Sequence, residues 1–155
     1  IFTIATGFVL RVYAGAVALS VPVSSWMFVT TLCLALYLIA IKRRQELILH
    51  GKDGRRALKY YSVSLIDRYA DMSATGTLLF YSLFVMTARP EMIITIPFVF
   101  YGLFRYWFLV ESFDRGESPS DALLSDWQLM LTVVSWLVAS VAVLWPEGAL
   151  LESSG

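Results

Sequence analysis

The sequence predicts an all-α fold, a bundle of five transmembrane helices. Of its 155 residues, 58% are hydrophobic and only 15% are charged, whereas a soluble domain carries about a quarter charged residues. The charges are also clustered, and four stretches hold none of them: residues 12–41, 72–88, 92–104 and 127–146. An apolar run of roughly 18 residues can cross a hydrocarbon core about 30 Å thick. Runs that are apolar on all sides favour helices over barrel strands, which alternate apolar and polar residues.

Five apolar spans follow one another in a single transmembrane domain that covers the whole chain. Their approximate bounds are 1–20, 26–41, 72–88, 92–110 and 127–145. The first span contains one charge, Arg11, and the second opens on Trp26, a residue type that favours the membrane interface. Pro146, followed by glutamate and glycine, predicts the end of the fifth helix, because proline interrupts helical hydrogen bonding.

The basic residues predict how the bundle is oriented. Eight of the twelve Lys and Arg residues lie between Lys42 and Arg68, whereas the two short turns on the other side hold only one. Since Lys and Arg are enriched in cytoplasmic loops, we expect the segment 42–71 to be cytoplasmic. The second polar loop, 111–126, returns to the same side. A water-soluble substrate would meet a membrane-bound one at this basic face.

The run Lys42-Arg43-Arg44-Gln45-Glu46 has two interpretations. In the first, it is a basic helix end whose side chains reach anionic lipid headgroups. In the second, it is an anion site. If the second helix continues, Lys42 and Glu46 share one face, and Arg43 offers a planar fork to phosphate oxygens. Glu46 would then orient Lys42, or bind a hydroxyl group or a metal ion.

Other polar residues have competing interpretations as well. Asp67 and Asp71 lie four residues apart, so on a helix both could hold a magnesium ion bound to a diphosphate; the alternative is a helix start enriched in acids. Arg11 lies about halfway along its span, where an arginine is costly unless it faces the bundle interior or a wet cavity. We therefore expect Arg11 to line the interior. Arg105 ends the fourth span, where reaching the interface is the simplest role. The single Cys33 excludes a disulfide within the chain.

Several motifs, taken in order along nearly the whole chain, resemble one known family. These motifs are Gly7-Phe8-Val9-Leu10-Arg11-Val12 with Ala14-Gly15, Val21-Pro22-Val23-Ser24, Lys42-Arg43-Arg44 with Glu46-Leu47, Tyr61-Ser62 with Leu65-Ile66-Asp67, Ile96-Pro97-Phe98, Leu103-Phe104-Arg105-Tyr106, and Glu117, Pro119, Asp121, Leu123, Leu124 and Asp126. In these residues the chain resembles the polyprenyl-phosphate phosphoribosyltransferases, a branch of the UbiA prenyltransferase superfamily.

The resemblance implies a nine-helix fold of which this chain, opening on Ile1 within an apolar run, would supply the last five helices. It implies an enzyme that transfers 5-phosphoribose from phosphoribosyl diphosphate to a polyprenyl phosphate, in cell wall biosynthesis. The reaction releases diphosphate with the help of Mg²⁺. The aspartate-rich motif that mainly carries the metal lies in the first half of such proteins. This chain alone is therefore not expected to be active, and its partners would include the N-terminal half of the same protein.

The resemblance also orders the candidate site residues. In relatives that use prenyl diphosphates, a second aspartate-rich motif follows the helix that corresponds to 26–41, and here Lys42 and Glu46 take that position. Direct cationic contacts suit a donor with three phosphate groups, because they can replace a second metal ion. The catalytic candidates are Lys42, Arg43 and Glu46. The substrate-binding candidates are Arg11, Lys42, Arg43, Tyr61 and Arg105. The metal candidates within this chain, Glu46 and Asp67, are of second rank.

Two other functions stay open at this point: a UbiA-type aromatic prenyltransferase, and a membrane transporter or scaffold without enzymatic activity. The Lys-Arg pair in place of an aspartate motif argues against the first. The resemblance implies a bacterial inner (plasma) membrane protein, with the lipid bilayer as a partner and no nucleic acid. The length of the lipid and the oligomeric state, homo-oligomer or not, are not predicted.

Overall fold

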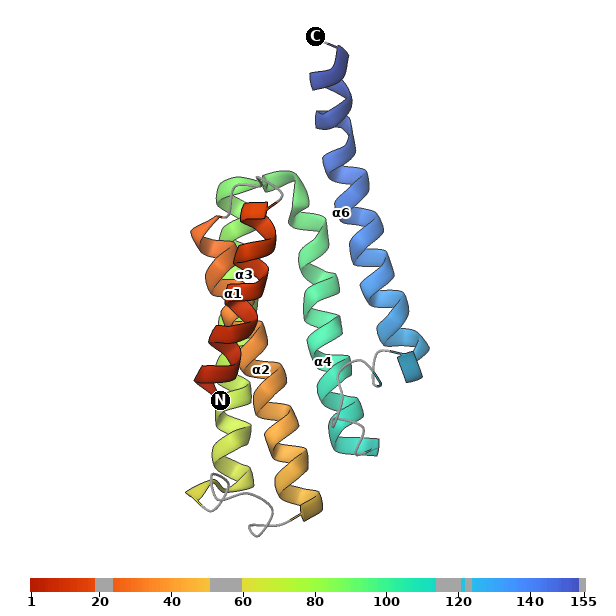
Figure 1. The fold of residues 1–155 in the computed structure, drawn as a ribbon. Coiled ribbons are helices and arrows are strands. Elements are labelled where there is room, and N and C mark those ends of the chain that lie inside the picture. The colour runs from red at the N-terminus through yellow and green to blue at the C-terminus, as the bar shows by residue number, and fades with distance from the viewer. Residues whose placement is uncertain (19–23, 51–59, 114–120, 122–123, 154–155) are drawn as a thin grey trace.

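The computed structural model describes residues 1–18, 24–50, 60–113, 121 and 124–153. The predicted all-α class is confirmed: the described residues form five long α-helices and one 3-10 helix, and no strand occurs among them. In chain order these elements are α1 (Phe2–Ala18), α2 (Ser25–His50), α3 (Val63–Ala88), η3 (Pro90–Thr95), α4 (Ile96–Phe113) and α6 (Trp127–Ser153) (Figure 1).

Two helices extend beyond their predicted spans into polar sequence. α2 continues past Ile41 to His50, and α3 begins at Val63 rather than near residue 72. A helix satisfies its own backbone hydrogen bonds, so it can leave the apolar stretch without a break. The start of α3 is set by Ser62, whose Oγ accepts a hydrogen bond from the backbone N–H of Leu65 at 3.2 Å. This is an N-cap, which satisfies one of the first N–H groups of the helix.

Two of the prolines, Pro146 and Pro97, have different effects on their helices. The predicted end of the last helix is wrong, because α6 continues past Pro146 to Ser153. A proline removes one helical hydrogen bond and bends the chain, but the turns on either side still form theirs. Pro97 lies in the first turn of α4, where the N–H groups lack helical partners and proline is well tolerated.

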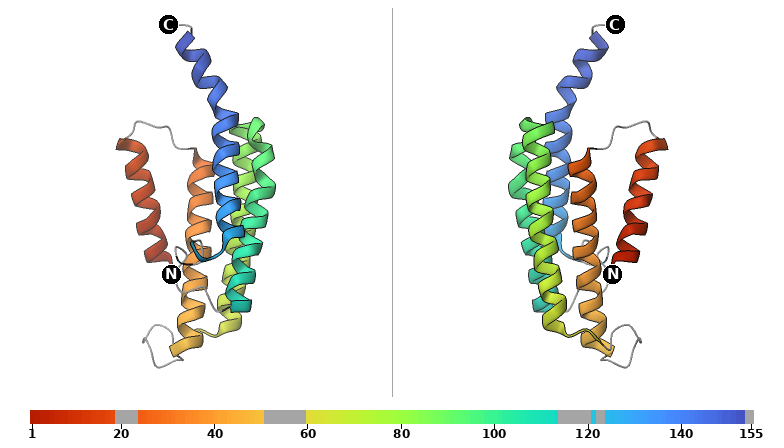
Figure 2. Two further views of the ribbon diagram at one scale, coloured as in Figure 1. Left: turned by 90° about the vertical axis from the view of Figure 1, so that its right-hand side faces the viewer. Right: turned by 90° about the vertical axis from the view of Figure 1, so that its left-hand side faces the viewer.

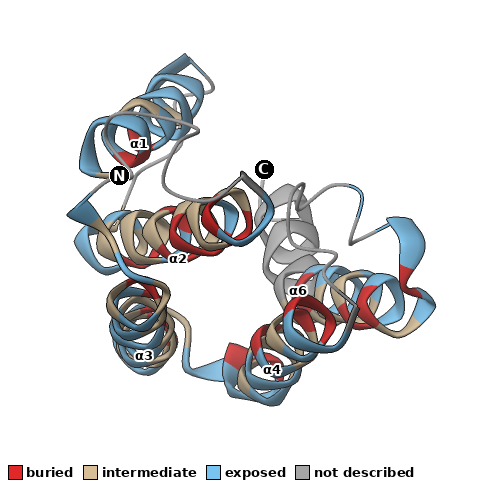
Figure 3. Cartoon of the chain, turned by 90° about the horizontal axis from the view of Figure 1, so that it is seen from below, coloured by how far each residue is buried: buried red, intermediate tan, exposed pale blue. Residues whose placement is uncertain are grey.

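The helices pack as two groups with α2 in a central place. α2 lies along α3, and α1 contacts α2, while α4 packs against α6 (Figure 3). The 3-10 helix η3 joins the groups, because it contacts α3, α4 and α6. In side view α1 stands apart from α4 and α6, with α2 between them (Figure 2).

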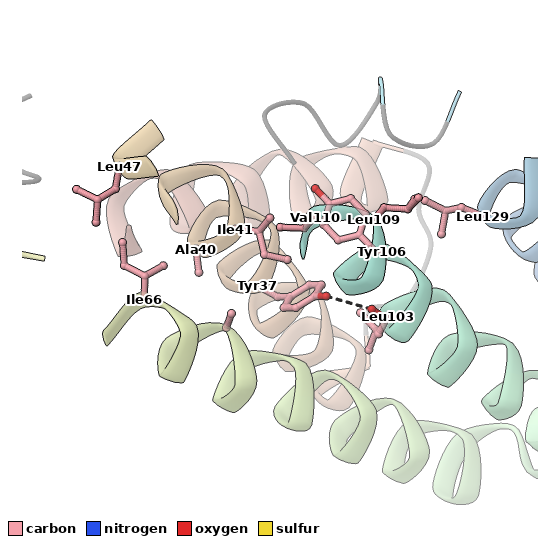
Figure 4. Packing of buried hydrophobic residues seen from close by; sticks show 11 residues of the cluster. Tyr37, Ala40, Ile41, Leu47, Ile66, Leu103, Tyr106, Leu109, Val110 and Leu129 are labelled. Atoms are coloured by element: carbon pink, nitrogen blue, oxygen red, sulfur yellow. Dashed lines mark hydrogen bonds between the residues drawn. The ribbon is translucent and has the colours of Figure 1, made fainter. Parts of the chain in front are cut away.

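The largest core cluster lies where α2, α3 and α4 meet, and it includes one residue of α6. Its best-buried members are Tyr37, Ala40, Ile41, Leu47, Ile66, Ala70, Leu103, Tyr106, Leu109, Val110 and Leu129 (Figure 4). A smaller cluster of Tyr81, Val85 and Met92 lies where α3 meets η3. The hydroxyl of Tyr37 donates a hydrogen bond to the Leu103 carbonyl at 3.2 Å, which ties α2 to α4 in the middle of the larger cluster.

Two stretches are long and apolar enough to cross a membrane, Ser25–Leu49 and Pro90–Ser112. Phe2–Ala18 and Trp127–Val143 are apolar but shorter. In each of the two longer stretches only 28% of the most apolar window is buried within the structure. The core helix of a soluble protein would be mostly buried, so these outward apolar surfaces favour a membrane environment. Five membrane crossings stay a prediction.

Candidate functional site at the basic end of the bundle

The candidate residues gather at one end of the bundle. The last turns of α2 and α4 and the first turns of α3 converge there, at the lower end of Figure 1. The helix ends that lead into the polar segments 42–71 and 111–126 therefore lie on the same side of the bundle, as the charge pattern predicts. The four basic residues between positions 52 and 59 lie outside the described residues, as do Glu117, Pro119 and Leu123 of the last motif.

The three successive cations of α2 have different surroundings. Lys42 is exposed, and Arg43 forms an ion pair with Glu46 on the same helix. The Arg44 side chain is only 11% exposed, and its Nε donates a hydrogen bond to Asp67 Oδ1 at 2.6 Å. Successive helical residues point about 100° apart, so neighbours in sequence face different sides. Arg44 faces α3 and α4, whereas Lys42 faces away from them.

The carboxylates of this end are engaged differently from the sequence prediction. α2 does continue as a helix, so Lys42 and Glu46 share a face, but Glu46 pairs with Arg43. Asp67 pairs with Arg44, and Asp71 instead borders a pocket of about 540 Å³ between α3 and α4 together with Glu111. The described residues contain no group of three His, Cys, Asp or Glu side chains placed to hold a metal ion.

Arg11 is exposed in the structure of this chain. That it lines the interior of a complete bundle stays a prediction. α1 packs mainly against α2, and its buried residues Ala5 and Val9 lie one turn apart. Arg11 follows Val9 by two residues, about 200° around the helix, and so lies on the face opposite α2. No helix described here covers that face.

Arg105 has a protein partner. Its Nε and Nη2 donate hydrogen bonds to the two carboxylate oxygens of Asp126, at 2.9 and 2.8 Å. Asp126 Oδ2 also accepts from the backbone N–H of Leu129 at 2.9 Å, so it caps the start of α6. The pair joins α4 to α6, and both residues are largely buried. The last substrate-binding candidate, Tyr61, packs at the edge of the core with its ring 6.4 Å from that of Tyr69.

Sequence reasoning missed three residues with structural roles: Arg44, Gln45 and Asp126. Asp126 carries a local signal, because an aspartate directly before an apolar helix is a typical N-cap. Gln45 is fully buried and donates to the Val110 carbonyl at 3.2 Å. Its partner and that of Arg44 lie 65 and 23 residues away in sequence. Contacts over such distances leave no local pattern.

An apolar cavity of about 420 Å³ lies between α2, α3, α4 and α6. Its walls include Met27, Leu34, Val99 and Val133, as well as several threonines. The threonine hydroxyls donate to carbonyls of their own helices, at 2.7 Å for Thr30 and 2.8 Å for both Thr77 and Thr132. With their hydroxyls satisfied in this way, they add little polar character to the cavity. It therefore suits a hydrocarbon ligand.

Apolar outer surfaces, an apolar pocket between the helices and a charged end are features that favour a helical membrane protein. Comparison with known proteins agrees with this class. No family model matches the chain. It is, however, similar to curated proteins named decaprenyl-phosphate phosphoribosyltransferase in three bacterial species.

The protein of this name from Corynebacterium glutamicum is 27% identical over 149 residues, 89% of this chain and 44% of the relative. That of Mycobacterium tuberculosis is 28% identical over 145 residues, with shares of 88% and 47%. That of Mycolicibacterium smegmatis is 27% identical over 151 residues, with shares of 86% and 47%. The chain spans about half the length of the curated relatives it matches. The resemblance predicted from the motifs is confirmed by these relatives, which are transferases by name.

Proposed function

We propose that this chain is part of a membrane enzyme that transfers 5-phosphoribose from phosphoribosyl diphosphate to a polyprenyl phosphate, with release of diphosphate. One observation carries the proposal: curated relatives that share a phosphoribosyltransferase name match 86–89% of this chain. The proposal includes five membrane crossings in a bacterial inner membrane, with the segment 42–71 in the cytoplasm. It also includes the need for a further half, since the relatives are about twice as long.

The apolar cavity supports a lipid acceptor. Part of a polyprenyl chain would lie between α2, α3, α4 and α6, where burying apolar surface is favourable. The cavity reaches Tyr37 and Tyr106, which belong to the core cluster next to the charged end. A phosphate at the head of such a lipid would therefore lie near the level of the basic residues.

The cations of α2 support the donor site. Lys42 is exposed, and the Glu46 carboxylate holds the Arg43 guanidinium in place before any donor arrives. During transfer the bond from the anomeric carbon to diphosphate breaks, and the bond to a lipid phosphate oxygen forms. Cations beside the diphosphate stabilise the charge that develops on it, and binding both substrates places the reacting atoms together. No nucleophilic side chain is needed.

The residues described here do not make a site for the Mg²⁺ that the resemblance implies. The two acids proposed for it, Glu46 and Asp67, are each paired with an arginine. No group of three potential ligands occurs in the described part of the chain. The proposal for this chain accordingly rests on its cations, and its ligands for magnesium would come from the half that it does not cover.

A transfer assay tests the proposal. The full-length protein that contains this chain is purified in detergent and given labelled phosphoribosyl diphosphate and a polyprenyl phosphate. Lys42→Ala and Arg43→Ala should each lower transfer about ten- to a hundredfold, because losing one charge-assisted phosphate contact removes about 1.5–3 kcal/mol. Arg68→Ala is the matched control, since it removes an exposed cation from α3 at the same end.

The outcomes separate the alternatives. Near-normal transfer in both α2 variants would overturn the donor site. Prenyl transfer from a prenyl diphosphate to an aromatic acceptor, without phosphoribosyl transfer, would identify an aromatic prenyltransferase instead. If neither reaction occurs with the intact protein, a transporter or scaffold role replaces the proposal.

A further inference from the structure

Arg44 connects three helices at the charged end. Besides its hydrogen bond to Asp67 on α3, its Nη2 lies 3.8 Å from Glu111 Oε1 on α4. Its guanidinium carbon lies 5.6 Å from the ring centre of Trp107, also on α4. A planar guanidinium can pair with a carboxylate at its edge and stack on an aromatic ring with its face. Arg44 makes both kinds of contact, with a carboxylate and with an aromatic ring, and only 11% of its side chain is exposed.

Gln45 strengthens the same connection. Its Nε2 donates to the carbonyl of Val110, which lies in the last turn of α4. The last four carbonyls of a helix have no helical partner, so this hydrogen bond caps α4 from outside. Residues 44 and 45 therefore fasten the end of α2 to α4, although α4 packs mainly against α6.

Lys42 and Arg43 differ from Arg44 in what they can reach. Lys42 is exposed, and the described partner of Arg43 is Glu46, one turn along the same helix. Among the residues that the structure describes, neither forms an ion pair with α3 or α4, because the turn of α2 directs their side chains to another side. Arg44, by contrast, is committed to Asp67 and Trp107 and has little surface to offer a ligand.

We infer that Arg44 is a positioning residue: it holds the last turns of α2 on α3 and α4, so that Lys42 and Arg43 present their charges to the donor. The inference rests on the proposed function and deepens it, because it divides one basic run into two ligand contacts and one structural anchor. Arg44 touches neither substrate and takes no part in bond making.

A double-mutant test distinguishes this role from direct contact. Arg44→Ala should lower transfer about ten- to a hundredfold through misplacement of the donor contacts. Because Arg44 acts through both Lys42 and Arg43, adding Arg44→Ala to the Lys42→Ala, Arg43→Ala double variant should lower transfer no further. Arg44→Lys keeps the charge but loses the fork and the stacking, so it should be as impaired as Arg44→Ala. A further loss when Arg44→Ala is added to that double variant, or full activity in Arg44→Lys, would overturn the inference.

A second measurement does not depend on activity. Backbone hydrogen exchange in residues 42–50 and 107–113 should become faster in Arg44→Ala, because the helix ends lose their anchor, and should be unchanged in Lys42→Ala. Unchanged exchange in Arg44→Ala would refute the positioning role even if the wild-type protein transfers phosphoribose. Absence of transfer in the wild type would refute the proposed function alone. If Arg44→Ala does not fold, the variant Asp67→Asn, which removes the same ion pair, is used for both the transfer assay and the hydrogen-exchange measurement.

Discussion

A buried hydrogen-bond chain holds the other end of the bundle, and Tyr81→Phe tests it. Trp136 Nε1 on α6 donates to the Tyr81 hydroxyl at 3.0 Å, and that hydroxyl lies 2.6 Å from Thr95 Oγ1 in η3. Thr95 donates its single hydroxyl hydrogen to the Met92 carbonyl at 2.6 Å. Tyr81 must therefore be the donor to Thr95. The chain links α3, η3 and α6 beside the apolar cavity, which Tyr81 and Trp136 line.

Removing the Tyr81 hydroxyl breaks two hydrogen bonds and leaves the ring in place. Each bond contributes about 0.5–1.5 kcal/mol net, and an indole N–H left without its partner adds a desolvation cost. Hydrogen bonds between helices in a membrane average about 0.6 kcal/mol, which sets the lower end of the range. Tyr81 is 4% exposed, so water cannot replace the lost partner. We expect Tyr81→Phe to lower the free energy of unfolding by about 1–3 kcal/mol.

The measurement is equilibrium unfolding of the purified full-length protein in detergent, followed by circular dichroism. Tyr101→Phe is the matched control, because it removes a hydroxyl that donates to Gln128 at 3.2 Å on the exposed surface of α4 and α6. Exposed substitutions of this kind change stability by less than about 0.5 kcal/mol. Equal unfolding free energies for Tyr81→Phe and Tyr101→Phe would show that the buried chain does not hold this end together.

Three further predictions use other contacts. Asp126→Ala should destabilise the protein more than Asp126→Asn, because asparagine still caps α6; equal unfolding midpoints would contradict the cap. Gly76→Ala should be less stable than Gly15→Ala, since a Cβ at Gly76 would lie 2.9 Å from Cys33 Sγ while nothing lies within 4 Å at Gly15. Adding Cys33→Ala should remove that difference in unfolding free energy. Ser62→Cys in a Cys33→Ala background should react with an impermeant thiol reagent in inverted vesicles; labelling in intact cells would refute the orientation.

The sequence by itself determined the class of fold and the order of the helices. Uncharged stretches long enough to cross a bilayer predict helices at the right places, because chain length and the cost of burying charge are local properties. The start of α6 at Asp126 could also be predicted, since capping involves neighbouring residues. The motif order predicted the similarity to phosphoribosyltransferases, which the curated relatives confirm.

Only the tertiary structure decided what each charged residue contacts. Lys42, Arg43 and Arg44 are three like charges in a row, and their different roles depend on which helices lie beside each face of α2. Arg11 is exposed because it lies on the face of α1 opposite α2.

The apolar cavity could not be predicted from the sequence either, because its walls come from four helices spread over residues 27–136. Helix positions follow from interactions within a few residues, whereas pairings across the bundle depend on how whole helices pack. For this reason the charged end could be located from the sequence, but the different partners of its three successive cations could not.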